Sequence, residues 1–173
     1  MRLHIGGEEI KEGWKILNIQ KKSGVDFIGD ITDLSQFDDE SVEEVYASHV
    51  LEHIGMAKIR STFDGIHRIL KKGGKFYISV PNLDTLTKIF VQMPEGQEKY
   101  NIMIMIYGGQ TDSHDFHYFG YWPSLLFSIL TNAKFKRYER VEFFNIFKDT
   151  SMCTTNTLNG TIPISLNVIA YKD

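Results

Sequence analysis

Short apolar runs, separated by glycine, proline and charged residues, dominate the first half of the chain. Each run has the length of a strand, and most are rich in β-branched or aromatic side chains. The predicted strands are Arg2–Ile5, Lys15–Ile19, Val25–Ile28, Glu44–Ala47 and Lys75–Val80.

A helical pattern separates the fourth and fifth of these runs. Apolar residues recur at Ile59, Phe63, Ile66 and Leu70, which is the spacing of one helix face, and a glycine pair at 73–74 is a stop signal. A strand, a helix and a second strand form a right-handed unit with parallel strands. Strands joined by such crossovers predict a three-layer α/β sandwich with a mostly parallel sheet.

The second half of the chain is patterned differently. Residues 82–121 are expected to be irregular, and a second helix is predicted over Leu125–Thr131. Two long strands follow at Lys136–Phe144 and Ile164–Tyr171, with a turn signal at Asn159-Gly160 between them. These runs predict a final antiparallel pair at one edge of the sheet.

Composition fits one globular domain. With 173 residues the chain can bury a core, and 42% hydrophobic with 24% charged residues is ordinary for a soluble protein. The net charge of −3 leaves no basic field for a phosphate backbone, so nucleic acid is not expected as the main partner.

Cys153 is the single cysteine, which excludes an internal disulfide and a Cys-rich metal cluster. No signal peptide opens the sequence and the apolar runs are shorter than a membrane span, so a cytoplasmic protein without a membrane partner is expected.

Ligands of an open α/β sheet bind at the carboxyl ends of its strands, so those residues form the candidate site. The first strand ends in Gly6-Gly7, where the missing Cβ lets the backbone approach a ligand, although a plain turn explains the pair equally well. The second strand ends in Asn18, whose amide can bond a ribose hydroxyl. The fourth ends in Ser48-His49.

The third strand ends in Asp30. Its carboxylate can accept a hydrogen bond from the exocyclic amine of adenine, while Ile31 and Leu34 can sandwich the ring. Each of these features is a weak signal alone, but four of them at successive strand ends are a stronger one.

At these positions the chain resembles the class I S-adenosylmethionine-dependent methyltransferases. The residues are LHIGG, WKILNIQ, VDFIGDITDL, VYASHVLEHI and RILKKGGKFYISVP in that order, and the tail SLLFSILTNAKFKRYERV resembles the last helix and sixth strand of that fold. The nearest resemblance is to short methyltransferases that accompany surface-polysaccharide genes. It covers most of the chain and is weakest at residues 85–121.

The resemblance implies a Rossmann-like fold, S-adenosylmethionine as cofactor, and strand ends that surround it. It would place Gly6 and Gly7 along the methionine and ribose, Asn18 on the ribose hydroxyls, Asp30 and Ile31 at the adenine, and Ser48 and His49 beside the sulfonium methyl.

The chain departs from the family pattern at three places. Glu8 stands where the second glycine of the usual loop belongs, and Asn18 replaces the usual acid. The link from Gly7 to Trp14 is too short for the usual first helix, so a turn is expected there. We expect a single domain over 1–173, in which residues 82–121 form an acceptor-side insertion or lid because no segment precedes the first strand.

His49, Glu52 and His53 spell H-x-x-E-H, which is also a zinc-protease spelling. Zinc would need both histidines on one helix and a third ligand from elsewhere. His49 falls at the end of the fourth strand, and His53 is interpreted as a hydrogen-bonded structural residue. The sequence therefore predicts no metal, and a zinc hydrolase built on these three residues is kept as an alternative.

A second cluster, GGQTDSHDFHYFGYW, covers residues 108–122. Such a loop can form an acceptor pocket with a general base, for which His114 beside Asp115, His117 and His49 are the candidates. The other interpretation is an aromatic-rich surface loop.

These observations predict methyl transfer from S-adenosylmethionine to an oxygen or nitrogen of a small-molecule acceptor. The resemblance alone suggests a sugar hydroxyl and a role in polysaccharide biosynthesis. Glu8 and Asn18 motivate a second alternative, a cofactor-binding protein without activity.

Overall fold

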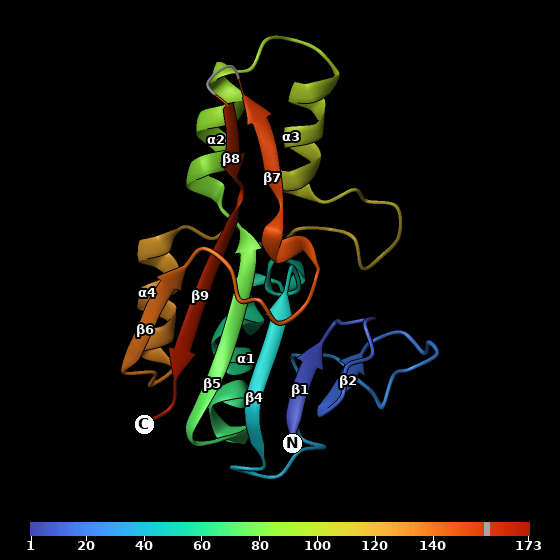
Figure 1. Ribbon diagram of the computed structural model, residues 1–173, viewed down its shortest axis with the longest axis vertical. Helices are drawn as coiled ribbons and strands as arrows, with labels where there is room; N and C mark the ends of the chain where they lie inside the picture. The colour runs from blue at the N-terminus through green and yellow to red at the C-terminus, as the bar shows by residue number, and fades with distance from the viewer. Residues whose placement is uncertain (158–159) are drawn as a thin grey trace.

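A twisted sheet forms the body of the molecule in the computed structural model, which describes residues 1–157 and 160–173 (Figure 1). Within those residues, seven strands lie in the order β3-β2-β1-β4-β5-β9-β6. Their bounds are β1 Arg2–Ile5, β2 Trp14–Asn18, β3 Phe27–Ile28, β4 Val42–Ser48, β5 Leu70–Pro81, β6 Arg137–Val141 and β9 Ser165–Tyr171. Residue 159 of the predicted turn at 159–160 lies outside the described residues.

The strand directions agree with the predicted fold class. Strands β1 to β5 pair in parallel, and β9 pairs antiparallel with both β5 and β6. The central strands are buried on both sides because both faces of the sheet are covered: Val45 and Phe76 are buried on one face, and the next residues, Tyr46 and Tyr77, on the other. The prediction of a mostly parallel Rossmann-like sheet with an antiparallel C-terminal strand is confirmed.

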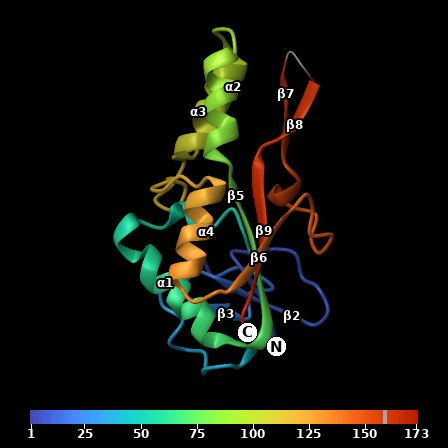
Figure 2. The same ribbon diagram turned by 90° about the vertical axis from the view of Figure 1, so that its left-hand side faces the viewer.

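Two helices cover one face of this sheet: α1 (Met56–Ile69) and α4 (Pro123–Asn132) (Figure 2). The predicted apolar stripe of α1 is buried, including Phe63 and Ile66. However, the helix ends at Ile69, before the glycine pair at 73–74 that was expected to stop it. The reason is that Leu70, predicted as the last residue of the stripe, already pairs with Val42 in the sheet.

Irregular chain, rather than helices, covers the other face of the sheet. Phe144 and Phe147, which follow β6, pack there on Trp14, Tyr46 and Tyr77. The link from β1 to β2 is the expected turn, in which Trp14 N donates to Lys11 O at 3.0 Å. A short 3₁₀ turn, η2 (Thr150–Met152), continues this layer.

The prediction of irregular structure over residues 82–121 is correct for the loop at 108–120 but wrong for the residues before it. They form α2 (Leu83–Gln92) and α3 (Gln97–Tyr107), which extend beyond one end of the sheet beside a hairpin of β7 (Thr154–Thr157) and β8 (Gly160–Pro163) (Figure 1). A second apolar core holds this extension together, and its buried members are Leu86, Ile89, Met93, Ile102 and Ile164. None of the described helices is long and apolar enough to cross a membrane.

Candidate functional site

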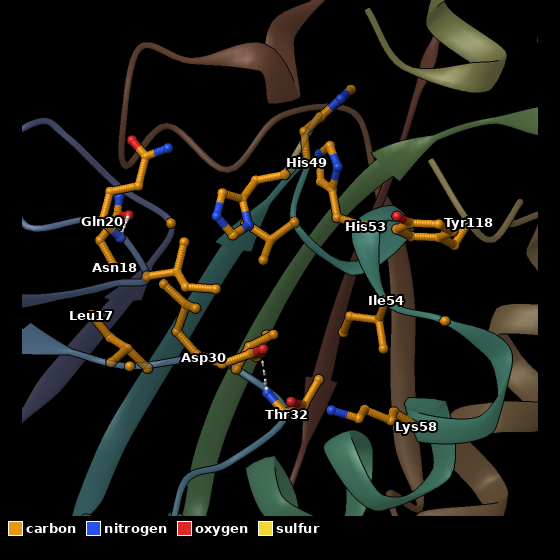
Figure 3. A pocket seen from close by; sticks show the side chains of 18 of the residues that line it. Leu17, Asn18, Gln20, Asp30, Thr32, His49, His53, Ile54, Lys58 and Tyr118 are labelled. Carbon is orange, nitrogen blue, oxygen red and sulfur yellow. Dashed lines mark hydrogen bonds between the residues drawn. The ribbon is translucent and has the colours of Figure 1, made fainter. Parts of the chain in front are cut away.

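A cavity of about 750 Å³ opens at the carboxyl ends of β1, β2, β3 and β4 (Figure 3). This is within the size range of pockets that enclose a cofactor-sized ligand. The predicted site residues that line it are Gly6, Asn18, Asp30, Ile31, His49 and His114. The structure therefore brings the ends of four separate strands, and one distant loop, to a single cavity.

Gly6 brings the backbone close to this cavity. Its φ is +73°, and a Cβ at this position would lie 2.5 Å from Val50 Cγ2. Its amide donates to Leu17 O at 2.8 Å, which fixes the turn after β1. Both the backbone conformation and the lack of space require glycine.

Asn18 connects two of the loops that border the cavity. The side chain is buried; its Nδ2 donates to Gly7 O at 3.3 Å, and its Oδ1 accepts from Gln20 N at 2.9 Å. A carbonyl oxygen has two lone pairs, so Oδ1 retains one acceptor site for a ligand. The neutral amide thus performs a structural role in addition to any role in binding.

Asp30 is held by its own turn. Its Oδ1 accepts from Thr32 N at 2.8 Å, and Thr32 and the buried Ile31 also line the cavity (Figure 3). No described residue bonds to Asp30 Oδ2, so this oxygen is free to accept from a ligand. The acid and an apolar side chain therefore meet at the same end of the cavity.

Glu8, which departs from the family pattern, lies at the rim of the cavity. It forms an ion pair with Lys22, and both residues line the cavity. The lysine therefore balances the charge of the unexpected carboxylate.

Several predicted residues lie outside the cavity. Gly7 packs closely against the ring of His4, so that a Cβ at position 7 would lie only 2.3 Å from His4 Nδ1. Leu34 is part of the main core, and Ser48 Oγ lies 3.1 Å from Thr150 Oγ1. These residues support the walls of the cavity and do not face it.

The 3₁₀ turn η1 (Leu51–His53) follows β4 and anchors the distant loop. The carbonyl of Glu52 accepts from the amides of both Tyr118 and Phe119, at 2.8 and 3.1 Å. His53 Nδ1 lies 3.1 Å from Phe116 O, so the imidazole donates to this carbonyl. Residues 116–119 therefore lie against the end of β4 and do not extend away from it.

His49 occupies the turn between β4 and η1, with φ +52°. His49 and His53 do not share a helix, as the sequence indicated, because α1 begins only at Met56. His49 Nε2 lies 2.9 Å from Ser165 Oγ, and its Nδ1 lies 3.4 Å from Glu52 Oε1. Burial lowers the pKa of His49 to about 4.

Glu52 is the residue of this region that strand-end reasoning did not single out. Its side chain is 2% exposed, and neither carboxylate oxygen has a hydrogen-bond partner among the described residues. His117 Nε2 lies 4.0 Å from Glu52 Oε1, and the rings of His53 and His117 are 4.8 Å apart. Burial raises the pKa of Glu52 to about 8, and it lowers the pKa values of His53 and His117.

The predicted pair of His114 and Asp115 is not formed. Asp115 Oδ2 instead accepts from Thr111 Oγ1 at 2.9 Å, within the same loop. His114 is exposed and lines the cavity without a hydrogen-bond partner for its ring among the described residues. If His114 acts as a base, Asp115 does not orient its ring.

A second cavity of about 440 Å³ lies between α2, α3 and this loop. His117 is part of its wall, and Tyr118 lines both cavities. The remaining wall is mainly apolar, with residues such as Leu83, Phe90 and Ile106. The two cavities are neighbours, separated by the histidines and Glu52.

Comparison with known proteins agrees with this geometry. Residues 8–78 match a family model described as a methyltransferase domain. The matched segment contains the ends of β2, β3 and β4, which form most of the larger cavity. A search of curated protein sequences gave no match to the chain.

The fold is shared with solved structures, among them methyltransferases. A SAM-dependent methyltransferase from Archaeoglobus fulgidus superimposes with a TM-score of 0.60 at 17% identity, over 98% of this chain and 85% of that chain. The YcgJ protein from Bacillus subtilis gives 0.57 at 15% identity, over 98% and 90%. Human N-acetylserotonin methyltransferase in complex with SAM gives 0.51 at 15% identity, over 92% and 41%. At these identities the likeness shows the fold, and together with the domain match it supports a methyltransferase enzyme that uses S-adenosylmethionine.

Proposed function

We propose that this protein transfers a methyl group from S-adenosylmethionine to a hydroxyl oxygen of a small-molecule acceptor. The observation that carries the proposal is the larger cavity, because it gathers Gly6, Asn18 and Asp30 from three strand ends, and most of its wall comes from the matched residues 8–78. Ligands of open α/β sheets bind at this edge.

The cavity walls suggest how the cofactor would lie. Asp30 Oδ2 and Ile31 offer an acceptor and an apolar contact to adenine, and Asn18 Oδ1 offers an acceptor to a ribose hydroxyl. The open backbone at Gly6 suits the methionine part, with His49 at the far end of the same cavity. Gly7, Leu34 and Ser48 would support these residues from behind.

The reaction requires mainly that the acceptor atom, the methyl group and the sulfur lie in line. The bound cofactor supplies a methyl group that is already activated on a sulfonium, so the chain must place an acceptor oxygen in line with it. The C–S bond breaks with its electron pair on sulfur, the new O–C bond forms, and the hydroxyl proton must leave. His114 is exposed in the cavity and is the candidate base, with His49 and His117 as further candidates.

The smaller cavity is the proposed acceptor pocket. Its wall joins the cofactor cavity at Tyr118, and it is formed by α2, α3 and the loop before α4. A sugar acceptor in polysaccharide biosynthesis rests on the sequence resemblance alone. Mass spectrometry of products from a panel of glycosides and amines would distinguish oxygen from nitrogen acceptors.

Calorimetry with S-adenosylhomocysteine, the demethylated product, tests the cofactor site. Asp30→Ala removes a charge-assisted acceptor and should weaken binding by about 1 to 3 kcal/mol, which is roughly 5- to 150-fold. Asp33→Ala is the matched control, because Asp33 Oδ1 makes the same kind of turn with Ser35 N at 3.0 Å but does not line the cavity. Equal losses in both variants, or no binding by the unmutated protein, would refute the assignment. Binding without turnover would favour the alternative of an inactive cofactor-binding protein.

A further inference from the structure

A buried carboxyl group that has no hydrogen-bond partner among the described residues lies beside the histidines that line the two cavities. Both oxygens of Glu52 are inaccessible to solvent and accept no hydrogen bond from the described residues. Leaving a buried carboxyl unpaired costs several kcal/mol unless a proton or a cation compensates it. Protonation would remove the charge, but both carboxyl oxygens would still lack a hydrogen-bond partner among the described residues, and the proposed methyl transfer does not explain this.

Two histidines beside Glu52 are fixed in the same tautomer. His53 Nδ1 lies 3.1 Å from Phe116 O, and His117 Nδ1 lies 3.1 Å from Met105 O. A carbonyl can only accept, so both Nδ1 atoms carry the hydrogen and both Nε2 atoms keep a lone pair. Histidines that bind metals are oriented in this way, with the second ring nitrogen donating to a carbonyl or carboxylate.

The three side chains offer ligand atoms within 4.8 Å of one another. We propose that Glu52, His53 and His117 bind one divalent transition-metal ion of the Zn²⁺ class. Two imidazoles and one carboxylate are a known ligand set for zinc with an open position. Ligand atoms around tetrahedral zinc lie about 3.3 Å apart, given bonds near 2.0 Å, so the three side chains would draw together on binding.

This site differs from the zinc alternative that the sequence suggested. That alternative used His49 with Glu52 and His53, whereas His49 Nε2 faces Ser165 Oγ and its Nδ1 lies 3.4 Å from Glu52. The third ligand comes instead from His117, because the amides of Tyr118 and Phe119 bond to the Glu52 carbonyl. His49 is thus a neighbour of the site that can orient the carboxylate.

The position of the ion suggests its use, which rests on the proposed function. His53 lines the cofactor cavity and His117 lines the smaller one, so the ion would lie where the two meet. A bound ion would offer an open position to the acceptor oxygen and would favour the loss of the hydroxyl proton there. The acceptor class is therefore a hydroxyl compound, with the metal as an aid to positioning and deprotonation.

Titration of chelator-treated protein with Zn²⁺, followed by calorimetry and thermal unfolding, tests the site without an acceptor. We expect one Zn²⁺ per chain and a rise in the unfolding temperature, and Co²⁺ should give the visible absorption of a low-coordination site. Glu52→Gln and His117→Gln should each weaken binding more than about 10-fold. His67→Gln is the control, because this half-buried histidine contacts Phe135 and lies outside the cluster.

The outcomes separate this proposal from the proposed function. No stoichiometric Zn²⁺ binding, or binding that both ligand variants retain, would overturn the metal site. Circular dichroism establishes that each variant is folded, and His53→Gln replaces any variant that is not. Zinc-free protein that still binds S-adenosylhomocysteine would leave the methyltransferase assignment intact, whereas Zn²⁺ binding without cofactor binding would leave the metal site and remove the assignment.

Discussion

The backbone conformation of Gly6 is expected to affect both the stability of the protein and its affinity for the cofactor. Gly6 has a φ of +73° and no space for a Cβ, whereas Gly73 has a φ of +76° and open space around it. Gly6→Ala and Gly73→Ala should both lose about 1 to 2 kcal/mol of unfolding free energy from backbone strain. Only Gly6→Ala, which would push Val50 toward the cavity, should also lose affinity for S-adenosylhomocysteine. Similar affinity losses in the two variants would mean that Gly6 acts through general stability.

His4 makes stability depend on pH. Its ring is buried against Phe147 and Tyr46, and burial lowers its pKa to about 4, partly opposed by Asp149 and Glu9. In the unfolded chain the imidazole of His4 gains its proton near pH 6.5, whereas in the folded chain it gains the proton only near pH 4. The contribution of His4 to the free energy of unfolding is therefore fully present above pH 6.5, and it is lost as the pH falls from 6.5 toward 4.

Urea unfolding at pH 7 and pH 5 measures this contribution. Between these values His4 should account for about 2 kcal/mol of the loss in the unmutated protein. His4→Gln should be less stable at pH 7 but should lose less on acidification. Parallel losses in both proteins would show that His4 is not the titrating group.

Individual site residues differed in how well the sequence predicted them. The position of Gly6, Asn18, Asp30 and His49 in one cavity was predictable because each lies at or just after the end of a strand, and strand ends converge in a parallel sheet. The proximity of His117 to Glu52 could not be predicted, because it depends on backbone hydrogen bonds between segments far apart in the chain. The motif H-x-x-E-H contains Glu52 and His53, two of the three residues of the proposed metal site, but nothing in it points to His117.

At the scale of elements, α2 and α3 contribute part of the wall of the smaller cavity, and the second apolar core holds these two helices together. Ile102 of α3 is 1% exposed in that core, whereas Tyr100 on the same helix is 54% exposed. Ile102→Ala should cost about 2 to 5 kcal/mol of unfolding free energy, and Tyr100→Ala about 0.5 kcal/mol or less. Urea denaturation monitored by circular dichroism measures both. If Ile102→Ala costs no more than the control, the packing of α3 described here is wrong.

The two helices illustrate why residues 82–121 were interpreted as irregular. Helix α2 does carry a helical signal, with Leu86, Ile89 and Met93 buried in the second core. Helix α3 contains IMIMI, which alternates isoleucine and methionine without a polar face, so its period cannot be read. Its one fully buried residue, Ile102, meets a core that includes Ile164 from the far end of the chain.

At the scale of the whole molecule, the order of local patterns was enough to predict the parallel sheet. Alternating strands and a helix stripe predict crossovers, and the short link between Gly7 and Trp14 correctly predicted a turn. The hairpin β7–β8 and the covering of the second face by Phe144 and Phe147 were not predicted. The covering of the second face depends on long-range packing that leaves no local period in the sequence. The hairpin pairs nearby residues, from Thr154 with Pro163 to Thr157 with Gly160, but its first strand, TTNT, has no apolar residue to mark it.

The central claim is that the cavity at the ends of β1 to β4 binds S-adenosylmethionine. A crystal structure of the protein with S-adenosylhomocysteine tests it most directly. We expect the adenine against Asp30 and Ile31, the ribose near Asn18, and the sulfur toward His49 and the wall formed by His53 and Tyr118. Ligand bound elsewhere, or a cavity that stays empty at saturating concentration, would contradict the account.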